Sequence, residues 1–169
     1  MPDATGLELT AHELREVNAE SILNTDFHRG RATLNAHPAH VGEVLAALRA
    51  KGYSFLASLH GCDYYPEEPR LGVIYELLDM KNVDRITVKA RVGIDDPRIG
   101  SAVDLFPGAN HPEREVYDMF GVVFEGHPDL RRILMPEDYE GFPQRRDFPI
   151  GGEPVLFTYN EENSYGKWQ

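Results

Sequence analysis

The chain has 169 residues and a formal net charge of −11, with 17 Lys and Arg side chains against 28 Asp and Glu. Hydrophobic residues make up 41% and charged residues 27%, which is typical of a globular protein rather than a disordered one. The acidic excess argues against nucleic acid or an anionic membrane surface as a partner, because binders of both concentrate positive charge. We therefore expect one globular domain whose partners are proteins or small molecules.

Cys62 is the single cysteine of the chain. It can form no internal disulfide, and one thiolate cannot supply an iron–sulfur cluster or a structural zinc site. A core thiol in a reducing compartment is the simpler interpretation. The N-terminal residues are acidic and contain no apolar stretch, and no apolar run is long enough to span a membrane. We therefore expect neither a signal peptide nor a transmembrane helix.

A helix and a hairpin are predicted at the start of the chain. Thr10 and Glu13 have the spacing of a capping box, so we expect a short helix from there to about Glu20. Residues 27–31 are typical of a hairpin turn, with residues 32–34 on the return strand.

A second helix is expected between Pro38, which suits a first helical turn, and Gly52, which ends it. Apolar residues recur between them at the spacing of one helical face, at Val41, Val44, Leu45 and Leu48.

Three strands follow, over residues 53–59, 71–78 and 85–92. The second is nearly all apolar, as a central strand covered on both faces would be. The third alternates, which predicts one buried face and one solvent face, and residues 81–84 join the last two strands as a hairpin. The sequence therefore predicts an α+β fold, with helices packed on a mostly antiparallel sheet.

Proline becomes frequent beyond Phe106, where seven of the 12 prolines lie. One more helix is expected, capped by Asn110, with Pro112 in its first turn and Gly121 at its end. The later prolines exclude a long helix or a central strand.

Apolar residues nevertheless continue at intervals after Gly121, so this segment needs a surface to lie on, either of its own domain or of another chain. They are Phe124, Leu130, Ile133, Leu134, Phe142, Phe148, Leu156 and Phe157. We divide the chain into an α+β domain (1–108), a helix closing the domain (109–121) and an extended Pro-rich C-terminal docking segment (122–169).

Carboxylates gather in the helix at 113–121, where Glu113, Glu115 and Asp118 could suggest acid–base catalysis or a divalent metal. Helical geometry argues against this, because Glu113 and Glu115 point to different sides. Arg114 and Asp118 are i, i+4 neighbours that we expect to pair. His127 lies in a loop and suits a hydrogen-bonding role. A structural helix with ion pairs is favoured over a catalytic pair.

Other chemical signals are weak. His60 and Cys62 share one face of a strand, but two ligands make a poor metal site. The sequence contains no glycine-rich nucleotide loop, zinc-protease motif or nucleophile elbow.

Two arginine pairs, Arg131-Arg132 and Arg145-Arg146, lie in the C-terminal segment. Either they pair with local carboxylates, or they bind a partner protein through planar, bidentate contacts. The pattern leaves both possibilities open. The local carboxylates are Glu137, Asp138, Glu140 and Asp147.

Residues 113–134 resemble the signature of the 30 kDa subunit of respiratory complex I. The resemblance rests on Glu113-Arg114-Glu115, Asp118, His127, Arg131 and Ile133-Leu134. Residues 136–149 resemble the C-terminal block of the same family, and Cys62-Asp63-Tyr64 and residues 73–78 and 94–97 occur in family order. His111 and Gln144 stand where the family usually has tryptophan and leucine.

The resemblance implies a non-catalytic structural subunit in the hydrophilic arm of a proton-translocating NADH:quinone oxidoreductase. It places no catalytic, cofactor-binding or metal residue on this chain, and FMN, iron–sulfur clusters and quinone on neighbouring subunits. The implied partners are the large quinone-proximal subunit and other subunits of the hydrophilic arm. The chain would be peripheral on the cytoplasmic side of the inner membrane, which it meets only through the complex.

The residues that the resemblance assigns to the family signature and to partner docking are Glu113, Arg114, Glu115, Asp118, His127, Arg131, Arg132, Phe142, Arg145, Arg146, Asp147 and Phe148. A related alternative is the same role in a ferredoxin- or deazaflavin-driven complex or a membrane-bound hydrogenase. Alternatives of another class are a stand-alone acid–base enzyme using Glu113, Glu115 and His127, and a free binding module.

Overall fold

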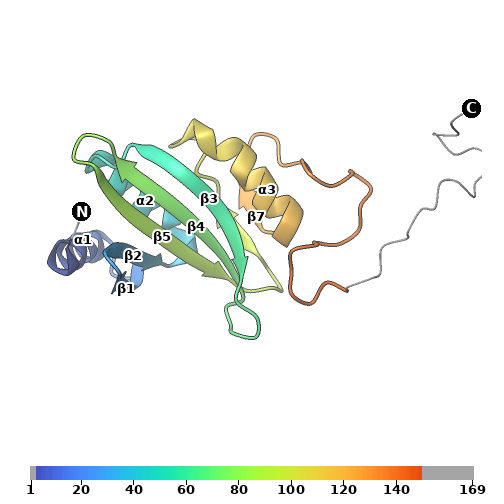
Figure 1. Cartoon of the computed structure of the whole chain (residues 1–169), viewed down its shortest axis with the longest axis horizontal. Coiled ribbons are helices and arrows are strands. Elements are labelled where there is room, and N and C mark those ends of the chain that lie inside the picture. The colour runs from blue at the N-terminus through green and yellow to red at the C-terminus, as the bar shows by residue number, and fades with distance from the viewer. Residues whose placement is uncertain (1–2, 150–169) are drawn as a thin grey trace, which may run out of the picture.

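The computed structural model of the protein describes residues 3–149. Its centre is a five-stranded sheet in the order β1-β2-β5-β4-β3 (Figure 1). Neighbouring strands are antiparallel except β2 and β5, which are parallel. The predicted α+β fold with a mostly antiparallel sheet is confirmed. The strands are β1 (Ile22–His28), β2 (Arg31–Ala36), β3 (Phe55–Asp63), β4 (Leu71–Asp79) and β5 (Asp84–Val92).

Within the described residues, three helices cover one face of this sheet. Helix α1 (Ala4–Val17) lies against β1 and β2, α2 (Val41–Ala50) packs behind the centre of the sheet in the view of Figure 1, and α3 (Asn110–Phe120) lies against β3. The predicted face of α2 is confirmed, because its four apolar residues are all buried. The chain folds this way because each helix has one apolar face to bury.

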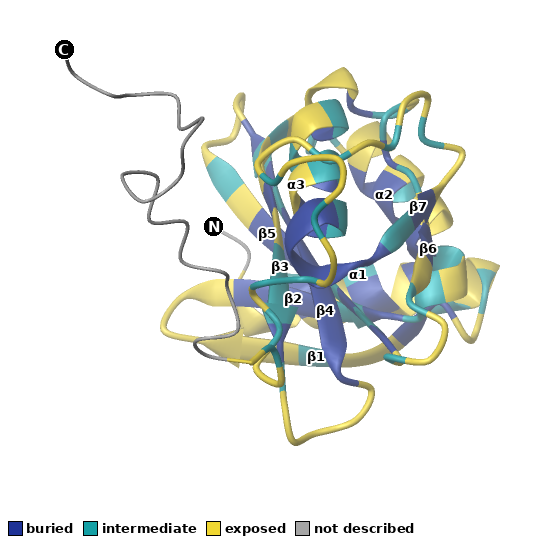
Figure 2. Ribbon diagram, turned by 90° about the vertical axis from the view of Figure 1, so that its right-hand side faces the viewer, coloured by how far each residue is buried: buried dark blue, intermediate teal, exposed yellow. Residues whose placement is uncertain are grey.

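Strand β4 is buried along nearly its whole length, as predicted, and is mostly dark blue in Figure 2. The alternation of β5 is confirmed for its apolar side, where Ile86 and Val88 are buried. Its polar side is less open to solvent than predicted. Thr87 is only 4% exposed, and its hydroxyl donates to the Glu76 carboxylate on β4 at 3.0 Å.

Two predicted helix starts are wrong. Helix α1 begins at Ala4, where the carboxylate of Asp3 accepts from the backbone N–H of Gly6 at 2.7 Å. Thr10 lies inside the helix and donates to the carbonyl of Gly6. Its hydroxyl cannot cap there, because interior N–H groups already bond within the helix. Asn110 is likewise the first residue of α3 and makes no cap, since a 3-10 turn over Pro107–Ala109 runs directly into the helix.

Beyond α3 the described chain has one short strand, β7 (Val123–Glu125), which pairs in parallel with β6 (Arg98–Gly100). Residues 126–149 contain no helix or strand and run past the end of α3 (Figure 1). Leu156 and Phe157, which we expected to be surface anchors, lie outside the described residues. Within residues 3–149, no helix combines the length and apolar character needed to cross a bilayer.

Candidate docking site

The carboxylate of Asp118 is fully buried near the end of α3 and binds the segment that follows the helix. Its Oδ1 accepts from the Arg132 guanidinium at 2.6 Å, and its Oδ2 accepts from the backbone N–H groups of Ile133, Leu134 and Met135 at 3.0, 2.7 and 2.8 Å. Burial opposes ionisation, but these donors outweigh it and hold the pKa of Asp118 below its usual value. The donors replace the water that the carboxylate loses.

Arg114 does not pair with Asp118, so the predicted i, i+4 ion pair is wrong. Its guanidinium donates instead to the carbonyl of Arg131 at 3.1 Å and to that of Arg132 at 3.2 Å. An i, i+4 pair on a helix surface contributes only about 0.2–0.5 kcal/mol, so partners from elsewhere in the chain readily replace it. Arg114 and Asp118 therefore hold the same segment from α3, one through its carbonyls and the other through its N–H groups.

Arg70 forms a second buried site, at the end of the β3–β4 pair. Its guanidinium makes a bidentate contact with Asp63 at 2.8 and 2.7 Å, and the side chains of Arg70 and Asp63 are only 6% and 2% exposed. Arg70 also binds both oxygens of Asp147, at 2.8 and 2.7 Å. The hydrogen bond from Arg70 is the main cause that lowers the pKa of Asp63. Asp63 also accepts from the backbone N–H of Arg146, so this site fixes residues 146–147 against the sheet.

Gly121 lies where the returning chain crosses the end of α3. It has φ +77°, and a Cβ atom at this position would lie 2.5 Å from the Phe142 ring and 2.6 Å from the Arg145 guanidinium. Arg145 donates to the carbonyl of Phe120 at 2.6 Å, and its guanidinium carbon lies 4.5 Å from the centroid of the Phe142 ring. Only glycine combines this backbone conformation with so close an approach.

These contacts form one set, which we call the anchoring network. Its members join α3 and the β3–β4 end to the segment after the helix, over spans of up to 83 residues. They are Asp63, Arg70, Asp118, Arg132, Arg145 and Asp147.

Most of this chain is similar to known proteins. A family model described as "Respiratory-chain NADH dehydrogenase, 30 Kd subunit" matches residues 34–154. The chain belongs to this family. The match spans α3, both buried arginine sites and the segment that they hold, and it confirms the resemblance seen in the sequence.

Similar members of the 30 kDa family are NADH-quinone oxidoreductase subunits. The chain is 44% identical over 149 residues to such a subunit of Roseiflexus castenholzii, covering 86% of both chains. It is 42% identical over 168 residues to the equivalent subunit of another Roseiflexus species, covering 98% of this chain and 94% of that one. NADH-quinone oxidoreductase subunit 5 of Thermus thermophilus is 48% identical over 124 residues, which are 68% of this chain and 60% of the relative.

Solved structures share the fold of the 30 kDa family. The trypsin-resistant fragment (1-134) of Nqo5 matches with a TM-score of 0.63 and 37% identity, covering 73% of this chain and 98% of the fragment. A chain of an archaeal membrane-bound sulfane sulfur reductase matches with a TM-score of 0.69, over 95% of this chain and 96% of that one. Its identity of 21% shows the fold alone.

Glu113 of the family signature is fully buried and faces the loop before α3. Its two oxygens accept from the Ser101 hydroxyl at 2.7 Å and from the Ala102 N–H at 2.6 Å. Burial raises the pKa of Glu113 above its usual value, against the effect of these two bonds. Glu115 is exposed. The two carboxylates do not converge, as helical geometry predicts.

His127 holds the loop after β7. Its Nε2 lies 3.1 Å from the carbonyl of Asn110, and its Nδ1 accepts from the N–H of Asp129 at 3.0 Å. These partners require the proton on Nε2. Both ring nitrogens are therefore engaged in holding the chain, which is the hydrogen-bonding role expected for His127.

The remaining predicted site residues differ in what they contact. Arg131 pairs with Asp129 at 2.7 Å on the surface, and Phe148 stacks on Tyr139 with ring centroids 6.3 Å apart. The side chain of Arg146 is exposed. Arg131 and Arg132 therefore pair with Asp129 and Asp118. In the described part of the chain, none of the four carboxylates considered as local partners forms an ion pair with either arginine pair, and Asp147 pairs with Arg70 instead.

Sequence reasoning missed Asp63 and Arg70 as members of this site. In the sequence Asp63 stands out only as part of a family tripeptide, and Arg70 follows a Pro-rich loop with no motif around it. No local signal could have paired Arg70 with Asp147. Among residues 3–149, no three His, Cys, Asp or Glu side chains are grouped as a metal site, His60 and Cys62 included.

Proposed function

We propose that the chain is a non-catalytic structural subunit in the hydrophilic arm of a proton-translocating NADH:quinone oxidoreductase, where it braces the large quinone-proximal subunit. The anchoring network is the observation that supports this role. A general acid or base needs a free atom facing its substrate. Asp118 is instead surrounded by four donors, and both oxygens of Glu113 are bonded inside the protein.

The anchoring network also supports a proposal for which side chains dock. Asp118 fixes the backbone of residues 133–135, and Ile133 and Leu134 are 38% and 61% exposed. Asp63 fixes the backbone of Arg146, whose side chain is exposed. We propose that Ile133, Leu134, Arg131 and Arg146 contact the large subunit, whereas Arg132 and Arg145 act inside the chain by setting the course of the segment.

Redox cofactors belong, in this proposal, to neighbouring subunits. FMN, iron–sulfur clusters and quinone would carry the electrons, and this chain would hold the subunits around them in place. The chain would lie on the cytoplasmic side of the inner membrane as a peripheral part of the complex.

A pull-down with matched variants tests the docking role. A tagged full-length chain carrying Ile133→Asp and Leu134→Asp would be expressed with the other subunits and recovered from solubilised membranes. We expect the large subunit to be lost from the pull-down, because two charges would enter an apolar contact. The control is Leu9→Asp with Val17→Asp, two residues of α1 that are 61% and 87% exposed. Normal recovery with the tail variant, or equal loss with both, would contradict the proposal.

The tagged chain and the subunits recovered with it also test whether this chain is catalytic and which electron donor the complex uses. The purified chain alone should not oxidise NADH with a quinone acceptor, whereas turnover that depends on Glu113 would favour the acid–base alternative. The input subunits recovered with the tagged chain distinguish NADH from ferredoxin or another donor.

A further inference from the structure

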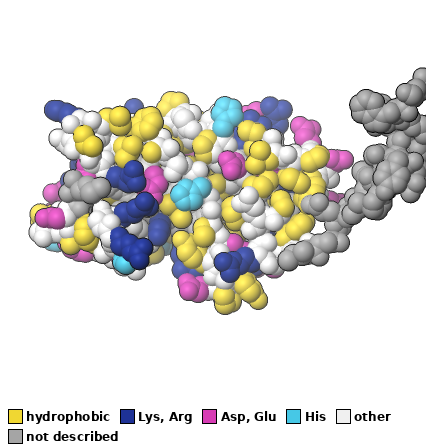
Figure 3. Space-filling view, in the orientation of Figure 1, with side chains coloured by type: hydrophobic (Ala, Val, Ile, Leu, Met, Phe, Trp, Pro, Cys, Tyr) yellow, Lys and Arg dark blue, Asp and Glu magenta, His cyan; other side chains and the backbone are white. Residues whose placement is uncertain are grey.

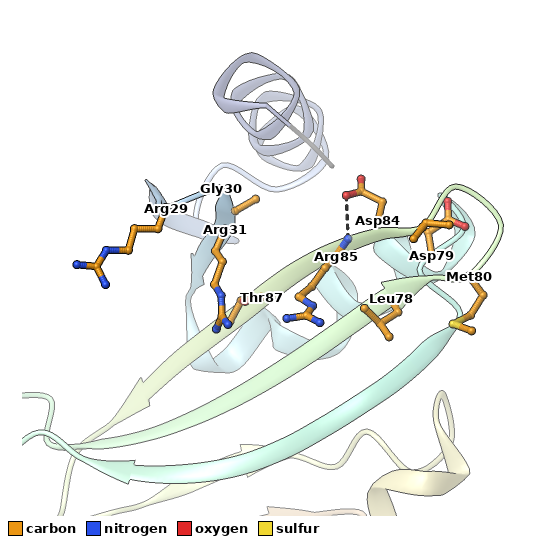
Figure 4. A pocket seen from close by; sticks show the side chains of 11 residues that line it. Arg29, Gly30, Arg31, Leu78, Asp79, Met80, Asp84, Arg85 and Thr87 are labelled. Carbon is orange, nitrogen blue, oxygen red and sulfur yellow. Dashed lines mark hydrogen bonds between the residues drawn. The ribbon is translucent and has the colours of Figure 1, made fainter.

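The face of the sheet opposite the helices ends in a groove between β2 and the β4–β5 hairpin. The groove has a volume of about 430 Å³ (Figure 4). Leu78, Met80 and Val83 form its apolar part. Its charged lining includes Arg31, Arg85, Asp79 and Asp84, and Arg85 is the cross-strand partner of Leu78. None of the helices that bury the core covers this face in Figure 1, where it points toward the viewer.

Arg31 and Arg85 are neighbours on adjacent strands. Each directly precedes a residue of the first registered pair between β2 and β5, which is Ala32 with Ile86. Like charges placed side by side on a sheet destabilise it. Both side chains are exposed, and neither forms an ion pair with a carboxylate of residues 3–149. Figure 4 shows both side chains extending from their strands on the side of Thr87.

Positive charge is concentrated on this face although the chain as a whole carries −11. Figure 3 shows Lys and Arg side chains gathered over the part of the sheet where β2 and β5 lie. Arg29 at the β1–β2 turn is a further exposed guanidinium that forms no ion pair in the described part of the chain. Two carboxylates, Asp79 and Asp84, also line the groove, and that of Asp79 already accepts from the N–H groups of Lys81 and Asn82. The three guanidinium groups outnumber them, so the patch is complementary to an acidic partner.

Val83 in the β4–β5 hairpin gives independent support. It has φ +53°, a left-handed conformation that is costly for a β-branched residue, and it is 84% exposed. Folding alone favours glycine or asparagine at such a position. Met80, in the same hairpin, is 66% exposed. Strain held at an exposed apolar side chain indicates that the side chain serves a contact outside the chain.

We propose that this groove binds an acidic segment of a neighbouring subunit, with its carboxylates at Arg31 and Arg85 and an apolar side chain against Met80 and Val83. This inference rests on the proposed place in a multisubunit arm, but it concerns a surface separate from the C-terminal segment. A flat anionic membrane fits less well, because the site is a groove and the whole chain is strongly acidic.

Charge reversal tests the proposal in the assembled complex. Tagged full-length chains carrying Arg31→Glu and Arg85→Glu should recover about tenfold less of one neighbouring subunit, and the loss should shrink as salt is raised. The control, Arg49→Glu with Arg98→Glu, changes the net charge equally on other surfaces and should leave recovery unchanged. Unchanged recovery with the groove variant would overturn the proposal. A failed docking role of the C-terminal segment would appear separately, as normal recovery with the Ile133 and Leu134 variant.

The substitution Val83→Asn distinguishes a contact between Val83 and a partner from the effect of Val83 on the stability of the chain. Asparagine relieves the left-handed strain, so the melting temperature of the purified chain should rise by about 3 °C, while recovery of the neighbouring subunit should fall. A rise in melting temperature with full recovery would assign no contact to Val83 and would overturn this part of the proposal.

Flotation of the full-length chain with phosphatidylglycerol vesicles tests whether the groove binds lipid instead of protein. Binding that the groove variant abolishes, together with normal assembly, would assign the groove to lipid and overturn the protein partner.

Discussion

Asp118 and Arg132 form a 2.6 Å ion pair between the end of α3 and the chain that returns past it. The side chain of Asp118 is fully buried and that of Arg132 is 13% exposed. Arg132 also donates to the carbonyl of Gly141 and lies 5.4 Å from the Phe142 ring centroid. This one pair therefore connects α3 to two successive parts of the C-terminal segment.

Removing the Asp118 carboxylate should release that segment. Asp118→Ala leaves a buried guanidinium and three N–H groups without their acceptor, so we expect a loss of about 3–5 kcal/mol in the free energy of unfolding, measured with urea. Trypsin should also cleave after Arg145 and Arg146 faster than in the unmodified chain. The control is Glu115→Ala on the exposed side of the same helix, which should cost less than about 0.5 kcal/mol. Equal effects of the two substitutions would show that the pair is not what holds the segment.

Asp63 and Asp147 bind the same guanidinium but should contribute unequally. The Asp63 side chain is 2% exposed and that of Asp147 is 50% exposed. Asp63→Ala should therefore cost about 3 kcal/mol or more, because it leaves Arg70 buried without its main partner. Asp147→Ala should cost less than about 1 kcal/mol, as an exposed pair does. Thermal unfolding of the two variants side by side checks this order, and the reverse order would contradict it.

Stability should decrease at acid pH through the same residues. The pKa values of Asp63, Asp118 and Asp147 are lowered in the folded chain. A lowered pKa contributes stability above the unfolded value, near 4, and that stability is lost as the pH falls through the folded value. The melting temperature should therefore fall steeply below about pH 4. Asp118→Asn should flatten part of that fall, and an unchanged profile would show that another group titrates.

Elements specified by neighbouring residues could be predicted from the sequence. Helix α2 follows from its apolar spacing between Pro38 and Gly52, and the β1–β2 turn follows from Arg29-Gly30, whose φ values are both positive. The start of α1 could not be fixed, because Asp3 and Thr10 are both good caps and packing of the earlier turns decides between them.

Partners in the anchoring network could not be predicted, because they depend on where distant segments meet. Arg114 and Asp118 have an ideal local spacing, yet both bind the segment at 131–135. Arg70 meets Asp147 across 77 residues, and only the completed sheet and the end of α3 bring them together. The family signature includes Asp118 and Arg132, but it does not show which residues contact each other, and it does not include Arg70.

Gly121 can be tested against a matched glycine. Gly121→Ala places a methyl group 2.5 Å from the Phe142 ring and also strains a residue with φ +77°. Gly126 has φ +82°, but a Cβ atom there meets nothing within 4 Å. Gly126→Ala should cost only the backbone strain, about 1 kcal/mol, whereas Gly121→Ala should cost at least about 1 kcal/mol more and expose the segment to trypsin. Equal costs would show that Phe142 moves away freely.

Glu113 should respond to substitution in the opposite sense from Asp118. Its pKa is raised, mainly by burial, so its ionised form opposes folding and its contribution to stability is lost as the pH rises through the folded value. Glu113→Gln keeps an oxygen for the Ala102 N–H and an amide for the Ser101 hydroxyl without the charge. It should therefore match or exceed the unmodified chain in the free energy of unfolding at pH 7. Glu113→Ala should lose about 2–4 kcal/mol, because it leaves a buried N–H unpaired and a cavity behind. A large loss with Glu113→Gln would instead mean that the negative charge itself stabilises the loop before α3.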